Sequence, residues 1–194
     1  MLTDARKNAM LDGECATNDK MSLHSAYSAS GANELASGGY ARQTITWGAA
    51  ANGSKSSSGN IDFTVANGDV VAWIGHWDSS GAIFRGMTPN GGSEKAFQVD
   101  LTNNRIYCEA HGMVDNDRVT FTGTPPTGLT AGTHYYVVGT VAGDPDYFQV
   151  SATLGGAAID ITGQAAANSR VSKIVIDSYG GAGTHRISSH TVSL

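Results

Sequence analysis

The segment Lys20–Trp47, KMSLHSAYSASGANELASGGYARQTITW, decides the fold of this chain. It begins and ends with residues of alternating polarity, and the loop Ser28–Gly39 between them is rich in Gly, Ser and Ala. Because side chains of a strand point alternately to opposite faces, the alternation predicts two half-buried strands joined by a long loop. The segment holds no catalytic constellation, so we interpret it as a structural signature.

The composition favours many short strands over a helical bundle. Charged residues make up 15% of the 194 residues, against about a quarter in an average protein, and there are 25 glycines. Hydrophobic residues make up 40% and occur in periodic runs, which argues against disorder. The length suits one large domain or two small ones.

The charge pattern predicts neither a nucleic-acid nor a membrane partner. The net charge is -5, and the 12 Lys and Arg residues are scattered, so no basic block is present for nucleic acid. No run of about 18 apolar residues occurs, and the start MLTDARKNAMLDGE lacks the features of a secretion signal. Cys15 and Cys108 match no paired metal or redox motif, so we expect two free thiols.

The first expected element is a short helix over Asp4–Asp12, ended by Gly13. At this length it is not stable alone, so it must dock on its own sheet or on a neighbouring subunit. Val70–Asp78, VVAWIGHWD, is apolar on nearly both faces and is the expected central strand. The other strands expected before residue 104 are 21–27, 40–47, 61–65, 83–87 and 96–101.

The stretch from Ile106 to about Arg170 consists of strand and turn units at short spacing and reads as a small β-domain. In the C-terminal strand, Ile187 is an odd-numbered apolar position, whereas Val192 and Leu194 are even-numbered. The apolar side chains therefore change faces between 187 and 192, which predicts a bulge. We therefore expect an all-β protein with a short N-terminal helix: a jelly-roll-like β-sandwich of residues 1–104 plus 171–194, with a second small β-domain, 105–170, inserted before the C-terminal strands.

The segments LHSAYSASGANEL, GGYARQTITWGAA, VAWIGHWD and HTVSL, in this order, resemble a family of small virion proteins of tailed bacteriophages, of the tail-fibre or minor tail type. The inserted part is similar to a β-module of phage structural proteins, through AHG, DRVTF, GLTAG, YYVV, FQVS and GGAAID at residues 110–160. The resemblance implies a non-enzymatic virion component, made in the host cytoplasm and bound to other virion proteins. It leaves capsid decoration open as the alternative location.

No catalytic residue, metal or cofactor is expected from the sequence. His185 and His190 lie on opposite faces of an extended strand, and the other histidines stand singly. The Asp-rich pieces 115–117 and 144–146 fit turns better than calcium loops. Gly48–Lys55 fails as a phosphate loop because Ser54 separates the glycine from the lysine. A small glycan hydrolase is the least favoured hypothesis.

Two groups of residues are candidates for contacts with partners. Tyr135, Tyr136 and Tyr147 in the insert are candidates for binding a host surface carbohydrate, although aromatic residues more often fill small β cores. The candidates for subunit contacts lie in the loop region and on the helix: Asn33, Glu34, Arg42, Arg6 and Met10.

A homo-oligomer is expected, because five lysines leave the edge strands lightly protected against pairing. Virion components are commonly symmetric, and a trimer is the expectation by analogy with fibres and decoration knobs.

Overall fold

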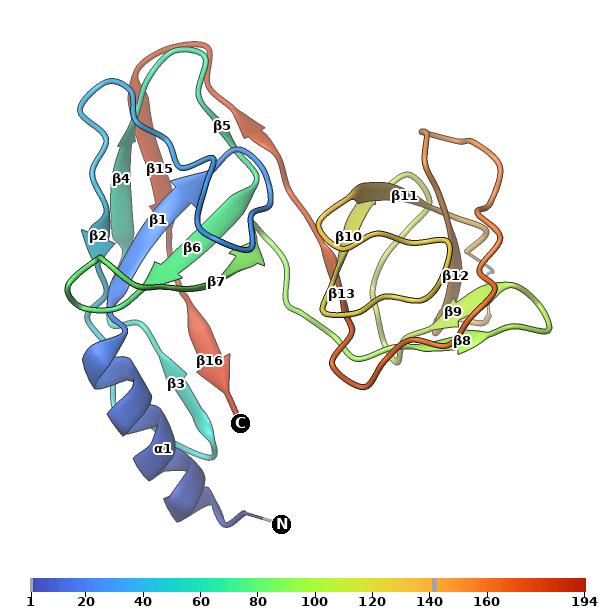
Figure 1. The fold of residues 1–194 in the computed structure, drawn as a ribbon, viewed down its shortest axis with the longest axis horizontal. Coiled ribbons are helices and arrows are strands. Elements are labelled where there is room, and N and C mark those ends of the chain that lie inside the picture. The colour runs from blue at the N-terminus through green and yellow to red at the C-terminus, as the bar shows by residue number, and fades with distance from the viewer. Residues whose placement is uncertain (1, 141–142) are drawn as a thin grey trace. The chain divides into compact units, whose positions relative to one another are not determined.

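The computed structural model describes residues 2–140 and 143–194. Apart from one helix, α1 (Asp4–Thr17), its regular elements are strands, so the all-β prediction is confirmed. The chain forms two compact units (Figure 1). Unit 1 comprises the chain up to Met87 together with Asp177–Leu194, and unit 2 comprises Thr88–Ile176.

Unit 1 is built on a four-stranded sheet with the order β2-β1-β6-β7. Its central strands pair antiparallel in a register that places Ser22 opposite Gly75. Residues 71–75 are all buried, which confirms the prediction that VVAWIGHWD supplies a central strand. The strands of this sheet are β1 (Lys20–His24), β2 (Gln43–Thr44), β6 (Trp73–Trp77) and β7 (Phe84–Pro89).

Three two-stranded pairs complete unit 1, and each joins the C-terminal part of the chain to an earlier segment. The pairs are β4 (Ile61–Val65) with β15 (Gly183–Ile187), β5 (Val70–Val71) with β14 (Asp177–Ser178), and β3 (Ser54–Ser56) with β16 (Thr191–Ser193).

The core of unit 1 lies between β4 and the four-stranded sheet. Ile61, Phe63 and Val65 are buried while Asp62 and Thr64 are exposed, as their alternation predicts. They belong to one apolar cluster with residues of β1 and β6, namely Met21, Leu23 and Ile74. This arrangement gives unit 1 its β-sandwich character.

Unit 2 is a six-stranded antiparallel sheet with the order β13-β10-β11-β12-β9-β8. One face carries the aromatic and branched side chains of the core, among them Phe121, Phe148 and Val137, which are fully buried. Its strands are β8 (Gln98–Asp100), β9 (Arg105–Tyr107), β10 (Arg118–Thr122), β11 (His134–Val138), β12 (Tyr147–Ser151) and β13 (Arg170–Lys173).

Unit 2 is larger than the inserted segment 105–170 expected from the sequence. The strand at 98–100, assigned above to the sandwich, pairs with β9 instead. The incoming and outgoing chains are also joined, because Lys95 bridges Val171 and the Val175 N–H donates to the Asn90 carbonyl at 2.8 Å. These long-range hydrogen bonds extend the unit to Thr88 and Ile176.

Several element boundaries differ from the sequence expectation: the expected strand 21–27 ends at His24, and the run 70–78 is divided into β5 and β6. The helix continues through Gly13 to Thr17 and ends where the Asn18 side chain donates to the Glu14 carbonyl at 3.0 Å. Between Tyr40 and Trp47 only β2 is a strand. The change of alternation near the C-terminus separates two strands with different partners, because β15 pairs with β4 and β16 with β3.

The helix and the β3–β16 ribbon form an appendage of unit 1 (Figure 1). Asp12 forms an ion pair with Lys55 of β3, and the Gly53 N–H donates to Asn8 Oδ1 at 2.9 Å. The buried residues of the helix are Leu11 and Cys15, and neither belongs to the apolar cluster of unit 1. The helix therefore docks on its own ribbon and leaves most of its surface exposed.

Replacing Gly75 by alanine should destabilise unit 1, because a Cβ there would overlap His24 Nε2 and Ser22 Oγ. We expect a loss of about 1–3 kcal/mol, as for other overpacked cores. All three tryptophans lie in unit 1, so tryptophan fluorescence during urea unfolding measures this unit specifically.

The matched control is Gly13→Ala, because a Cβ at this helical glycine meets nothing within 4 Å. This change should stabilise the helix by about 0.5–1 kcal/mol. Equal unfolding midpoints for wild type and Gly75→Ala would contradict the close packing between β1 and β6.

Candidate functional site

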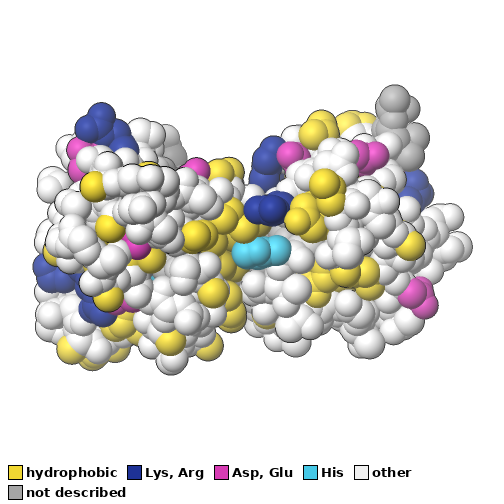
Figure 2. Space-filling view, turned by 90° about the horizontal axis from the view of Figure 1, so that it is seen from above, with side chains coloured by type: hydrophobic (Ala, Val, Ile, Leu, Met, Phe, Trp, Pro, Cys, Tyr) yellow, Lys and Arg dark blue, Asp and Glu magenta, His cyan; other side chains and the backbone are white. Residues whose placement is uncertain are grey.

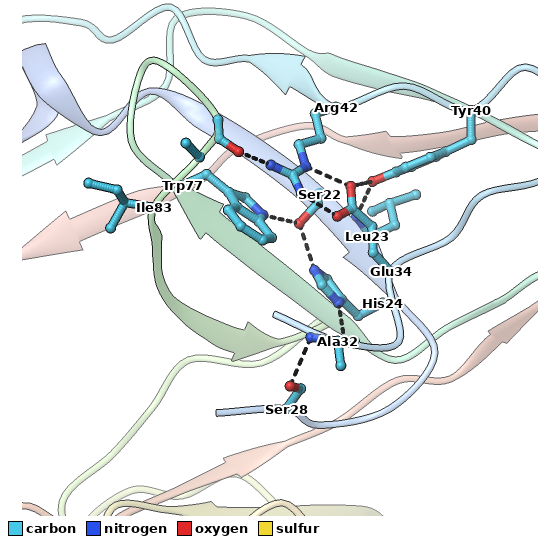
Figure 3. A network of polar contacts seen from close by, with 12 residues as sticks. Ser22, Leu23, His24, Ser28, Ala32, Glu34, Tyr40, Arg42, Trp77 and Ile83 are labelled. Atoms are coloured by element: carbon cyan, nitrogen blue, oxygen red, sulfur yellow. Dashed lines mark hydrogen bonds and ion pairs between the residues drawn. The ribbon is translucent and has the colours of Figure 1, made fainter. Parts of the chain in front are cut away.

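A chain of buried hydrogen bonds ties the signature loop to the central strands (Figure 3). The Trp77 Nε1–H donates to Ser22 Oγ at 2.7 Å, and Ser22 Oγ lies 2.6 Å from His24 Nε2. His24 Nδ1 lies 2.8 Å from the Ala32 carbonyl, which accepts only, so Nδ1 carries the proton. The Ser22 hydroxyl therefore donates to Nε2.

The Ser22–His24 pair resembles the nucleophile and base of a hydrolase in its spacing. Both side chains are fully buried, and the third group is a backbone carbonyl. Burial lowers the pKa of His24, against the opposing effect of the Ala32 carbonyl, so the ring is neutral at pH 7. The Ser22 oxygen faces Trp77 and is closed to a substrate, so this pair serves to hold the loop.

A second set of contacts fixes the end of the same loop. The Arg42 guanidinium donates to both carboxylate oxygens of Glu34, from Nε at 2.8 Å and from Nη2 at 2.7 Å. It also donates to the Gly81 carbonyl and lies 3.4 Å from the centroid of the Trp77 ring (Figure 3). This geometry combines a bidentate ion pair with a cation–π contact.

Tyr40 joins Glu34 to the strand β1. Its hydroxyl donates to Glu34 Oε1 at 3.2 Å and accepts from the Leu23 N–H at 2.8 Å. Burial raises the pKa of Tyr40, so the hydroxyl keeps its proton. The Leu35 N–H in turn donates to the Leu23 carbonyl, which ties the loop directly to the strand.

Ser28 and Asn33 shape the tip of the loop. Ser28 Oγ accepts from the backbone N–H groups of Ala32 and Ser30, at 2.9 and 3.1 Å. Asn33 has a φ of 63°, a conformation that asparagine tolerates better than most residues, and its side chain donates to the Tyr27 carbonyl. The loop is therefore a structured element with its own hydrogen bonds.

The candidate subunit contacts fall into two groups. Glu34 and Arg42 face each other and are 19% and 27% exposed, so their charges are already used within the chain. Asn33, Arg6 and Met10 are exposed. Of the residues named from the sequence, these three are the ones that the structure leaves open to a partner.

The three candidate tyrosines do not form one site. Tyr135 is buried in the core of unit 2, and its hydroxyl accepts from the Thr130 N–H at 2.9 Å. Tyr136 lies on the opposite side of β11 and packs against Arg118. Tyr147 packs against Tyr107 and Arg105, with ring centroids of the tyrosines 5.1 Å apart.

The acidic turns accept hydrogen bonds from nearby segments of the chain. Among residues 2–140 and 143–194, no group of three or more His, Cys, Asp or Glu is placed to hold a metal ion. Asp115 accepts from the N–H and hydroxyl of Thr140, and Asp146 accepts from the Ala110 N–H. Cys15 and Cys108 are free and buried, and burial raises the pKa of both thiols.

Charged side chains are few and scattered among uncharged ones on the face shown in Figure 2. No helix in the described part of the chain is long and apolar enough to cross a membrane.

Arg42→Lys keeps the positive charge but should still destabilise unit 1, because lysine cannot form the bidentate pair with Glu34 or stack its planar group on Trp77. The expected loss is about 1–2 kcal/mol, the scale of charge-assisted hydrogen bonds at a partly exposed site. Urea unfolding followed by tryptophan fluorescence measures it.

Arg186→Lys is the matched control, because the Arg186–Asp62 pair is also bidentate but lies on the surface. It should leave the midpoint nearly unchanged. An unchanged midpoint for Arg42→Lys as well would show that the Glu34–Arg42 pair does not hold the loop.

The stability should decrease as the pH falls from 7 to 5, because burial lowers the pKa of all six histidines, that of His76 to about 3. Below about 6.5 the unfolded chain binds protons that the folded chain does not, so folding becomes less favourable. Differential scanning calorimetry should give a constant Tm between pH 7 and 8 and a lower Tm at pH 5. A Tm that stays constant down to pH 5 would contradict the neutral state of these rings.

No protein-family model, no curated protein and no solved structure matches this chain.

Proposed function

We propose that this chain is a non-enzymatic structural protein of a bacteriophage virion, of the minor tail or tail-fibre type, that assembles through contacts between subunits. The resemblance of four segments to tailed-phage virion proteins suggests this class. The all-β fold and the structured signature loop, whose polar groups bond within the chain, fit such a role. Capsid decoration is the second location that the same observations support.

The observation that carries the proposal is the appendage made by α1, β3 and β16. A helix of 14 residues and a two-stranded ribbon are each marginal in water. The helix buries Leu11 and Cys15 and exposes Met10, which is 48% accessible. Leu2 and Leu194, close to the two chain ends, are also exposed. A weakly supported appendage that exposes a few apolar side chains gains stability when another subunit covers it.

The appendage would therefore be the attachment element. Its partners would be further copies of this chain, in a homo-oligomer for which a trimer is the working model, and a neighbouring virion protein. Arg6, on the exposed side of the helix, would take part in the same contact.

Met10→Asp should reduce incorporation of the protein into phage particles at least severalfold, because it places a charge on the exposed side of the helix. Particles purified on a density gradient can be assayed by quantitative mass spectrometry. The control is Leu154→Asp, which adds the same charge at an exposed apolar position of unit 2. Equal incorporation of both variants at the wild-type level would contradict attachment through the appendage.

Labelled antibody against unit 2 on intact particles would separate the two locations. Label on tails supports the first choice, and label on heads supports capsid decoration. The absence of the protein from purified particles would contradict the virion proposal as a whole.

A further inference from the structure

A hollow of about 670 Å³ lies in unit 2, at the start of β12. It is lined by residues 110–114, 140 and 144–147. This volume falls in the range of small-molecule sites, about 300–1,000 Å³. The hollow mixes apolar side chains with a few polar ones, which is the usual composition of such sites.

Hydrogen bonds between the walls hold the hollow in shape. The Ala110 N–H donates to Asp146 Oδ1 at 2.8 Å, and the Cys108 N–H donates to the Asp146 carbonyl at 2.8 Å. On another side, Asp115 accepts from the N–H and hydroxyl of Thr140, at 3.0 and 2.7 Å. The walls are therefore formed before a ligand arrives.

His111 adds a buried imidazole to the lining. Its ring centroid lies 4.9 Å from that of Phe148, and its Nδ1 accepts from the Met113 N–H at 2.9 Å. Burial lowers the pKa of His111, although the Tyr147 carbonyl and Asp146 raise it. The ring is therefore neutral at pH 7, with its proton on Nε2.

The charges around the hollow limit the ligand. Asp144 and Asp146 place carboxylates in its lining, and Lys95, whose Nζ donates to the Ala110 carbonyl, places a cation beside it. Arg105 contacts Asp144 at 3.4 Å and lies 4.4 Å over the Tyr147 ring, so two cations balance the two carboxylates and the hollow favours neither an anion nor a cation. A neutral ligand with many hydroxyl groups remains, because hydroxyls donate to carboxylates and the C–H faces of a sugar pack on apolar side chains.

We propose that this hollow binds a neutral sugar residue of a larger glycan. Its hydroxyl groups donate to Asp144 and Asp146, and its apolar face packs against Pro145 and Val114, beside the Tyr147 ring that Arg105 covers. Three tyrosines were candidates for carbohydrate binding from the sequence. Tyr147 lines this hollow, whereas Tyr135 is buried in the core of unit 2. The proposal does not depend on the virion role, because the purified chain is sufficient to test it.

The test is a titration of the full-length purified protein with neutral and anionic oligosaccharides, followed by amide NMR shifts. Neutral sugars should shift the amide resonances of residues 110–114, 140, 144, 146 and 147. Val114→Glu introduces a bulky charge at an exposed position of the hollow, 62% accessible, and should weaken binding at least about tenfold.

Leu154→Glu is the matched control, because Leu154 is exposed to a similar degree and lies beyond the far end of β12. It should bind as the wild type does, and both variants should keep the wild-type urea midpoint, followed by far-UV circular dichroism because unit 2 holds no tryptophan. No shift with any neutral sugar, stronger binding of anionic glycans, or full binding by Val114→Glu would each overturn the proposal.

Discussion

The hydrogen bond between Ser22 and His24 is the contact on which the organisation of unit 1 depends. It is buried between β1 and β6, and it joins Trp77 on one side to the Ala32 carbonyl on the other. A buried polar group left without its partner costs about 1–3 kcal/mol, so this small network favours a single loop position. The Glu34–Arg42 pair, stacked on the same Trp77, fixes the other end of the loop.

The two parts of unit 1 differ in how they are stabilised. The sandwich has a continuous apolar core, and the hydrogen bonds of Ser22, His24 and Trp77 are closed within it. The appendage of α1, β3 and β16 depends on polar contacts such as Asp12–Lys55 and on two buried side chains, Leu11 and Cys15. A rigid platform with a weakly supported attachment element is the arrangement that motivates the proposed role in assembly.

Periodicity predicted the parts of the fold that depend on local burial. The alternation at Ile61, Phe63 and Val65 and the apolar run around Trp73 were sufficient to place two core strands. The strand at 98–100 was assigned to the sandwich, although it belongs to unit 2. Its pairing with β9 depends on hydrogen bonds between strands, which the periodicity of one segment does not reveal. The Gly13 position suggested a helix end, yet the helix formers that follow it extend the helix to Thr17.

The sites depended even more on contacts between distant residues. Ser22 and Trp77 are 55 positions apart, so nothing in the local sequence indicated their bond. The hollow in unit 2 likewise combines residues 110–114 with 144–147 through Asp146. The sequence did indicate which residue types were available, and the structure separated exposed Met10 and half-buried Tyr147 from Tyr135, which is buried.

The most direct measurement of the central claim is an electron cryo-microscopy map of the phage particle at side-chain resolution. We expect symmetric copies of this chain in which α1, β3 and β16 are covered by a neighbouring subunit, while the Glu34–Arg42 pair and the Ser22–His24 bond remain internal. A map in which the appendage faces solvent and the copies contact the particle through another surface would contradict it.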